Sequence, residues 1–212
     1  MRKTVLITVL FCIALQACNW QSNLPVYGPK TAVTKTENGK QVIDSLDYVL
    51  PPFQFVDQDS NVVNTSTVKG KIYVADFFFT SCPSICPKMM KEMLLVRDKY
   101  KDNKDVVILS YSIDPVRDSV ARLKIYETKL GITSAQWHFL TGNKDSIYYL
   151  ANKYLVSASE DPSAPGGHIH DGNFILVDRK GRLRGYYDGT NEQSVQKLLS
   201  EMDILLKEKN NE

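Results

Sequence analysis

The sequence predicts an α/β fold built on a largely parallel sheet, and three patterns support this. Residues 72–79 and 106–113 are two largely apolar runs of strand length, which is typical of central strands covered on both faces. Residues 88–100, which lie between them, carry apolar side chains at helical spacing. A predicted hairpin near the end of the chain adds antiparallel strands. Alternation of strands and helices implies parallel pairing of the earlier strands.

The remaining elements before the late hairpin follow in a regular order. A short hairpin precedes the first long strand, because residues 53–56 and 61–63 flank a polar turn. After the second long strand come a helix, a short strand and another helix, predicted at residues 120–130, 137–140 and 147–154.

The end of the chain completes the topology. Residues 174–178 and 183–187 form the late hairpin, joined by a turn in which Gly181 supplies a positive φ. Residues 195–206 give the most clearly amphipathic helix of the chain. This order of elements is a thioredoxin-like topology with an N-terminal β-hairpin and an inserted strand–helix unit.

The composition excludes several classes of protein. The chain has 212 residues, 43% of them apolar and 24% charged, which suffices for a packed core and excludes global disorder. Only one apolar run, at the very start, approaches membrane-spanning length, so a multi-span membrane protein is excluded. The formal net charge of +2 argues against a nucleic-acid partner.

The first residues resemble a bacterial lipoprotein leader. Arg2 and Lys3 precede an apolar stretch, residues 5–15, that has the length found in signal peptides. A small residue then stands directly before Cys18, as in the lipobox, where the chain is cut before the cysteine and lipid is attached to it. We therefore expect residues 1–17 to be a removed signal peptide and Cys18 to be lipidated. The alternative is an ordinary secretory signal with a chance cysteine.

This leader predicts where the mature chain works. We expect a protein of the bacterial cell envelope, anchored by lipid to a membrane and facing the periplasm or the cell exterior. Residues 18–47 are polar and lack a sustained period, so we interpret them as a tether that contains one short strand, ahead of the folded domain at residues 48–212. Only Cys82 and Cys86 then remain as thiols, in a compartment where cysteines are able to oxidise.

These two thiols stand where the first long strand meets its helix. In open α/β sheets, functional sites gather outside the carboxyl ends of the strands. Pro87 suits the first turn of a helix, so Cys82 and Cys86 are expected at a helix N-terminus, where the dipole favours the thiolate. Cysteines at this spacing are within disulfide reach and are also able to hold one soft metal ion. The pair alone leaves both uses open, and the structural alternative is an ordinary buried pair.

A third ligand would decide between these uses, and the chain offers three histidines. His138 lies within an apolar strand and is expected to contribute to packing or a hydrogen bond. His168 and His170 lie in a glycine-rich approach to the late hairpin, which a thioredoxin-like fold brings close to the cysteines. Alternate residues of a strand face the same way, so both are candidates, with a solvent-facing pair as the alternative. Two thiolates and an imidazole suit copper and also tolerate zinc.

Four motifs, in order and spanning roughly residues 50–206, resemble those of the Sco (SenC) family. They are Cys82-Pro83-Ser84-Ile85-Cys86-Pro87, Ser112-Ile113-Asp114-Pro115-Val116-Arg117-Asp118, Phe139-Leu140-Thr141-Gly142, and His170 placed eight residues before Asp178 of a Leu-Val-Asp-x-x-Gly hairpin. The resemblance implies a membrane-attached, copper-binding protein of thioredoxin-like fold. Such proteins assist assembly of the dinuclear copper centre of cytochrome c oxidase, by delivering copper or by reducing the cysteines of that subunit.

Carried over onto this chain, the resemblance makes Cys82, Cys86 and His170 the ligands of Cu(I) or Cu(II). Two features depart from the family pattern. Asp171 stands where serine or threonine is common, and His168 is an additional histidine and a candidate extra ligand. The acidic and basic residues of the second motif, Asp114, Arg117 and Asp118, are expected to cap a helix and hold the loop rather than to take part in catalysis.

We therefore predict a copper metallochaperone that carries one copper ion, acts as a monomer and serves the copper-site subunit of cytochrome c oxidase. The alternative is a thiol–disulfide oxidoreductase, with Cys82 and Cys86 as its redox-active pair, that reduces cysteines of a partner protein. Three residues rather than two separate the cysteines, which counts against this alternative. A peroxiredoxin-like peroxidase is disfavoured, because neither cysteine has a threonine three positions earlier.

Overall fold

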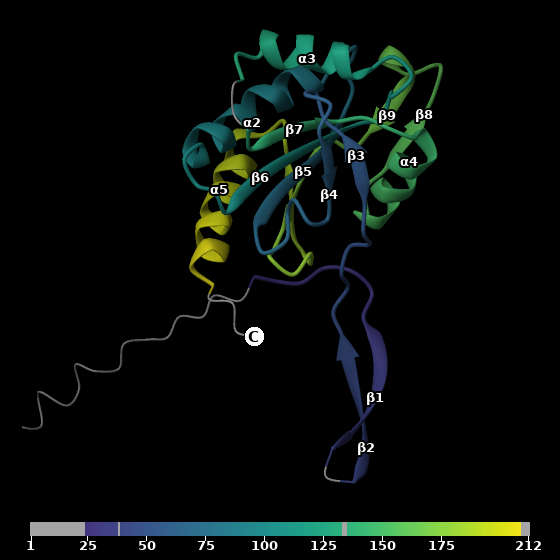
Figure 1. Cartoon of the computed structure of the whole chain (residues 1–212), viewed down its shortest axis with the longest axis vertical. Coiled ribbons are helices and arrows are strands. Elements are labelled where there is room, and N and C mark those ends of the chain that lie inside the picture. The colour runs from purple at the N-terminus through teal and green to yellow at the C-terminus, as the bar shows by residue number, and fades with distance from the viewer. Residues whose placement is uncertain (1–23, 38, 133–134, 209–212) are drawn as a thin grey trace, which may run out of the picture.

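A five-stranded mixed sheet, in the order β11-β10-β5-β6-β7, forms the centre of the domain (Figure 1). The computed structural model describes residues 24–37, 39–132 and 135–208, so the predicted leader and Cys18 lie outside the described residues. The strands of the sheet are β5 (Ile72–Phe78), β6 (Val106–Ser112), β7 (Trp137–Leu140), β10 (Asn173–Val177) and β11 (Leu183–Asp188). β5, β6 and β7 run parallel, whereas β10 is antiparallel to both β5 and β11. The predicted parallel sheet with a late antiparallel hairpin is confirmed.

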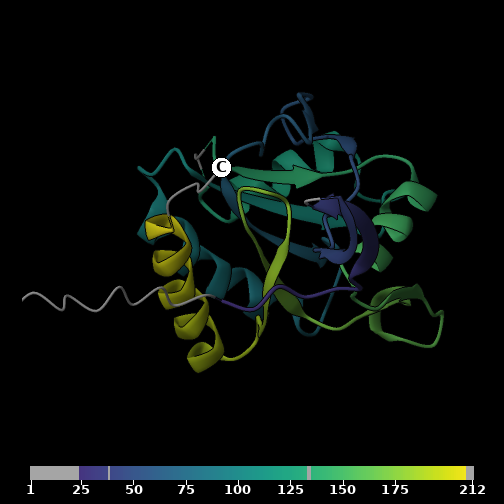
Figure 2. The ribbon, with the colours of Figure 1, turned by 90° about the horizontal axis from the view of Figure 1, so that it is seen from below.

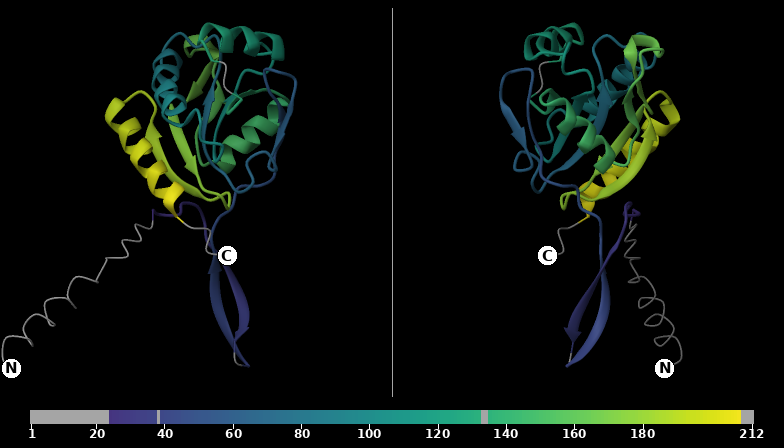
Figure 3. Two further views of the ribbon diagram at one scale, coloured as in Figure 1. Left: turned by 60° about the vertical axis from the view of Figure 1, so that its left-hand side comes forward. Right: turned by 90° about the vertical axis from the view of Figure 1, so that its right-hand side faces the viewer.

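Both faces of this sheet are covered. The helices are α2 (Cys86–Tyr100), α3 (Val120–Lys129), α4 (Lys144–Lys153) and α5 (Glu192–Lys207). α2 and α5 lie on one face, and α4 lies on the other together with the predicted hairpin of β3 (Gln54–Val56) and β4 (Val62–Asn64) (Figures 2 and 3). Every residue of β5 and β6 is buried, which explains why their sequences are apolar runs instead of alternating patterns. None of the described helices has the length and apolar character needed to span a bilayer.

The N-terminal segment differs from its prediction. β1 (Thr31–Glu37) and β2 (Lys40–Leu46) form an antiparallel ribbon that projects from the domain (Figure 1), where we expected one short strand. Nearly all of its side chains are exposed. A ribbon exposed on both faces needs no apolar alternation, so its sequence carries no clear period. The local signals are its β-branched residues and Gly39, which has a φ of 75° at the turn.

The ribbon joins the domain at the amino ends of the parallel strands. Leu50 N donates a hydrogen bond to Gly181 O at 2.9 Å, in the turn between β10 and β11. Val177, at the end of β10, pairs with Tyr73 near the start of β5. The ribbon therefore projects from the pole opposite to the carboxyl ends of β5 and β6, where functional groups gather in open α/β sheets.

A further small sheet lies beside the central one. β8 (Ala158–Glu160) pairs with β9 (His168–His170), and we call residues 158–170 the strap. Between these strands, Gly166 has a φ of 83°, and a Cβ atom there would lie 2.6 Å from Cε2 of Phe79. Glycine is therefore required at this position both for its backbone conformation and for close approach of the strap to the end of β5.

The loop that joins β6 to α3, residues 113–119, ties two parts of the domain together. Asp118 is fully buried and accepts hydrogen bonds from Thr80 N at 2.9 Å and from Ser112 Oγ at 2.6 Å. Thr80 Oγ1 also donates to this carboxylate, at 2.5 Å. The predicted loop-holding role is thus confirmed for Asp118. The predicted helix-capping role is wrong, because Ser119 is the N-cap of α3, and its Oγ accepts from Arg122 N.

Asp118→Ala should lower the free energy of unfolding by about 3 kcal/mol, because it leaves several buried donors around Thr80 without an acceptor. Urea denaturation of the purified protein measures this loss. Arg122→Ala is the matched control, since it removes a half-exposed ion-pair partner of the same carboxylate and should cost less than about 1 kcal/mol. Equal losses in the two variants would contradict the dominance of the buried hydrogen bonds.

Candidate metal centre

The cysteines occupy the loop and the first helical turn that follow β5. Cys82 N donates to Phe79 O at 3.2 Å, and α2 begins at Cys86 with Pro87 in its first turn, as predicted. Cys82 is 9% exposed and Cys86 is 1% exposed, so the first residue of the pair is the more accessible. Both thiols lie at the positive end of a helix, which favours ionised sulfur.

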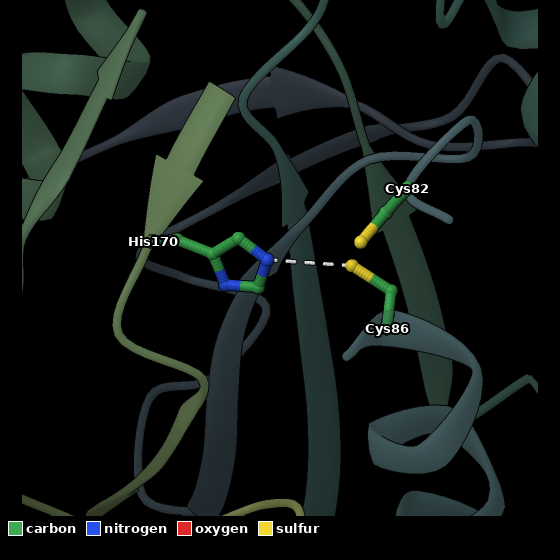
Figure 4. A group of neighbouring side chains, drawn as sticks. All are labelled: Cys82, Cys86 and His170. Atoms are coloured by element: carbon green, nitrogen blue, oxygen red, sulfur yellow. Dashed lines mark hydrogen bonds between the residues drawn. The ribbon is translucent and has the colours of Figure 1, made fainter. Parts of the chain in front are cut away.

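His170 reaches these thiols from the strap. It ends β9, and its Nε2 lies 3.3 Å from Cys86 Sγ (Figure 4). Cys82 Sγ, Cys86 Sγ and one ring nitrogen of His170 all lie within 4.8 Å of one another. Of the three histidines that the sequence offers, the structure brings this one to the cysteine pair.

The two thiols hold their protons unequally. A hydrogen bond from Cys86 stabilises the Cys82 thiolate, with a further contribution from His170, and lowers the pKa of Cys82 to about 3. The same hydrogen bond, together with burial, raises the pKa of Cys86 well above the ordinary value of a thiol. The free pair therefore carries one thiolate and one thiol at neutral pH. The second proton leaves when a cation takes its place, so metal binding releases a proton.

The three donor atoms fit a soft metal ion. At ordinary metal–sulfur and metal–nitrogen distances, ligand atoms lie about 3.5–4 Å apart, so the observed set needs only small adjustments to close on one ion. Two sulfurs and an imidazole suit copper or zinc, whereas calcium and magnesium prefer oxygen ligands. The donor chemistry therefore agrees with the ligand set predicted from the sequence.

A buried carboxyl group near the site was absent from the predicted set. Asp76 of β5 is fully buried, and its Oδ1 accepts from Ser110 Oγ, whereas no described residue forms a hydrogen bond with Oδ2. Burial raises the pKa of Asp76 to about 7, although Ser110 and the nearby His170 act in the opposite direction. The available signal was a single acidic residue within the otherwise apolar run of residues 72–79, because an isolated buried charge is costly.

The other two histidines serve different contacts. His138 Nδ1 lies 2.9 Å from Asp57 Oδ2, which confirms the predicted hydrogen bond. His168 faces the same side as His170, and the rings of both lie near Phe79, at 5.1 and 6.1 Å between centroids. The solvent-facing alternative is wrong for His168, whose side chain is 7% exposed.

The nitrogens of His168 face other groups of the protein. Nδ1 lies 3.2 Å from Tyr148 Oη, and Nε2 lies 3.5 Å from Asp114 Oδ2. Among the described residues, the group whose ligand atoms lie close enough together to hold one metal ion consists of Cys82, Cys86 and His170 and does not include His168.

Asp76→Asn should stabilise the reduced, metal-free protein increasingly as the pH rises from about 4 to about 7. The Asp76 carboxyl ionises in the unfolded chain above its ordinary pKa of 3.8, but it stays protonated in the fold up to about pH 7. The wild-type protein therefore loses stability across this window, and an amide does not. The gain should reach roughly 2–4 kcal/mol and then level off. Urea unfolding at several pH values measures it, and a pH-independent difference between the two proteins would contradict the raised pKa.

Comparison with known proteins supports a single family. A family model described as SCO1/SenC matches residues 43–205, so the match begins within β2 and ends within α5. The SCO1 protein homolog of Bacillus subtilis is 34% identical over 166 residues, which cover 77% of this chain and 86% of the relative.

Solved structures share the fold. A SCO1/SenC family lipoprotein from Bacillus anthracis is 30% identical with a TM-score of 0.69, over 76% of this chain and 96% of that one. BsSco, a member of the Sco family of cytochrome c oxidase assembly proteins with a disulfide switch, is 32% identical with a TM-score of 0.68, over 77% and 96%. Copper-bound ScoI of Bradyrhizobium japonicum is 28% identical with a TM-score of 0.60, over 72% and 98%. The predicted thioredoxin-like fold and the predicted family are both confirmed: this chain belongs to the SCO1/SenC family.

Proposed function

We propose that this protein carries one copper ion on Cys82, Cys86 and His170 and assists assembly of the dinuclear copper centre of cytochrome c oxidase. One observation carries the proposal. Two sulfurs and one ring nitrogen, from segments 84 residues apart in the chain, converge within 4.8 Å of one another. Both cysteines are buried and His170 is partly buried, so these donor atoms are held together by the fold and are not free side chains on the surface.

Copper is the metal that the comparisons and the donor chemistry favour together. A thiolate pair with an imidazole binds Cu(I) or Cu(II) well and binds zinc also, so the donors alone leave two metals. The copper-bound ScoI structure, which shares the fold, favours copper. Three protein donors leave further coordination positions open to ligands of a partner protein, which suits a carrier that must release its cargo.

The redox state of the cysteine pair controls whether copper binds. Cys82 and Cys86 must both be thiolates to bind the metal, and a disulfide offers no thiolate. Oxidation of the pair therefore empties the site, and reduction restores it. The disulfide switch of BsSco supports the same coupling in this chain.

Anchoring at Cys18 would confine the carrier to the membrane surface of the cell envelope. The lipobox-like leader and the lipoprotein relative from Bacillus anthracis support this location. An anchored carrier meets the copper-site subunit of cytochrome c oxidase in two dimensions, which raises their effective concentration. One chain supplies the whole donor set, so the proposal requires only a monomer.

Anaerobic titration of the reduced protein with copper should saturate at one ion per chain. Cys82→Ala and Cys86→Ala should each abolish binding, because each removes a thiolate, and His170→Ala should weaken it by at least about tenfold. His138→Ala is the matched control, since His138 contacts Asp57 and lies outside the donor group, and should bind as the wild type does. Unchanged affinity in His170→Ala would overturn the ligand assignment.

The unequal cysteines favour thiol–disulfide exchange as a second candidate function. Cys82 is the more exposed and the more acidic thiol, which suits it to attack a disulfide, whereas Cys86 is buried and protonated. In this reaction the Cys82 thiolate attacks a partner disulfide to form a mixed disulfide and releases one partner thiolate. Cys86 then loses its proton and attacks Cys82 Sγ, which releases the second thiolate. The partner gains two electrons, and the pair of this chain becomes a disulfide.

Alkylation kinetics test the asymmetry on which this second candidate depends. In the reduced, metal-free protein at pH 7, iodoacetamide should modify Cys82 at least about tenfold faster than Cys86, because only Cys82 is a thiolate. Cys86→Ala removes the hydrogen bond that chiefly stabilises the Cys82 thiolate, so it should raise the pKa of Cys82 in a titration followed by thiolate absorbance. Equal reactivity of the two cysteines would contradict the assigned roles. A His170→Ala variant that keeps reductase and assembly activity while losing copper would favour exchange over delivery.

A further inference from the structure

The strap that carries His170 is held to the domain by side chains. In the described part of the chain, β8 and β9 pair with each other and form no ladder with the five-stranded sheet. A metal ligand on a loosely held segment must be ordered at each binding event, and this ordering lowers the affinity. The contacts that order the strap in advance therefore decide how well His170 serves, and several of them converge on His168.

His168, at the start of β9, contacts two separate parts of the domain. Its Nδ1 lies 3.2 Å from Tyr148 Oη on α4, and its Nε2 lies 3.5 Å from Asp114 Oδ2 on the β6–α3 loop. Tyr148 Oη also donates to Ile113 O at 2.9 Å, so this hydroxyl lies between His168 and the β6–α3 loop. Both ring nitrogens of His168 therefore face protein groups on the body of the domain.

The strap backbone has a second attachment at the same place. Arg117 Nη1 lies 3.2 Å from Asp114 Oδ2 and donates to Gly166 O, in the strap, at 3.4 Å. Gly166 in turn packs against Phe79, where no larger residue fits. Asp114 thus links to the strap in two ways, directly to His168 and through Arg117 to the backbone of Gly166.

The β6–α3 loop holds the cysteine segment as well. Asp118 binds the backbone and the hydroxyl of Thr80, which stands two residues before Cys82. Asp114 and Asp118 are both nearly inaccessible, at 5% and 0% exposed, whereas the side chain of Arg117 is more than half exposed. One short loop therefore fixes the cysteine segment through Thr80 and the histidine segment through His168.

We propose that His168 is a positioning residue that locks the strap onto Tyr148 and Asp114 and so holds His170 against the cysteine pair. His168 supplies no donor atom to the metal in this proposal. It rests on the proposed copper site, because the position of His170 matters to affinity only if His170 is a ligand. Loss of the lock should lower copper affinity while the donor atoms stay the same.

Three substitutions in the full chain separate the lock from direct ligation. His168→Phe keeps the ring that packs on Phe79 but removes both nitrogens. Tyr148→Phe removes only the hydroxyl that His168 contacts and leaves every sulfur and nitrogen donor of the site in place. His138→Phe is the matched control, because it breaks a comparable histidine–aspartate contact, with Asp57, outside the strap.

The first measurement needs no metal. Hydrogen–deuterium exchange of the reduced, metal-free protein should show faster exchange at the strap amides, residues 158–170, in both His168→Phe and Tyr148→Phe. The double variant should add little to either single one, because both break the same lock. His138→Phe should leave exchange at the strap unchanged. Wild-type exchange at the strap in both His168→Phe and Tyr148→Phe would overturn the proposal.

The second measurement uses Cu(II). Affinity should fall about tenfold in both His168→Phe and Tyr148→Phe, as for other residues that orient a metal ligand. The nitrogen hyperfine pattern in the electron paramagnetic resonance spectrum should match that of the wild type. Loss of one nitrogen coupling in His168→Phe, with Tyr148→Phe behaving as the wild type, would show that His168 is a ligand and overturn the proposal. Absence of copper binding in the wild type would refute the proposed function instead, and the exchange experiment would still test the lock.

Discussion

The candidate metal site depends on one long-range contact, in which a thiol at the start of α2 meets an imidazole at the end of β9. These two residues are 84 positions apart, so no local preference brings them together, and the register of the sheet does so instead. Ile175 of β10 pairs with Ala75 of β5 in antiparallel register. The beginning of β10, and with it His170 three residues earlier, is thereby delivered to the carboxyl end of β5, where the cysteine segment starts. A shift of this register would separate the sulfur from the nitrogen.

Polar groups are buried around this contact at some cost to stability. Asp76, Asp114 and Asp118 are all nearly inaccessible, and hydrogen bonds to the protein satisfy most of their oxygen atoms. Apolar side chains at these positions would carry a smaller desolvation cost. They would form no hydrogen bonds to fix the β6–α3 loop, the strap and the first turn of α2 in one arrangement. The buried acids therefore trade stability for a defined geometry at the place where the ligands meet.

The sequence predicts the central sheet and the cysteine pair well, because their signals are local. Two apolar runs mark β5 and β6, and Cys86 next to Pro87 marks the start of α2. His170 is different, because residue chemistry alone does not distinguish it from His168 as a ligand. Only the family motif, which places a histidine eight residues before Asp178, selects His170. The contacts of His168 depend on where α4 and the β6–α3 loop pack, which no local pattern encodes. The β1–β2 ribbon was not predicted, because a two-stranded element exposed on both faces has no alternation of apolar and polar residues in its sequence.

That ribbon has a consequence for where the ligand set points. It leaves the domain at the amino ends of the parallel strands, whereas Cys82 and His170 lie at the carboxyl ends. The seven residues of β5 alone separate the two poles by about 23 Å. Under the proposed lipid anchor at Cys18, the point of attachment and the ligand set would therefore lie at opposite poles of the domain, because the first described residues lie against the start of β11.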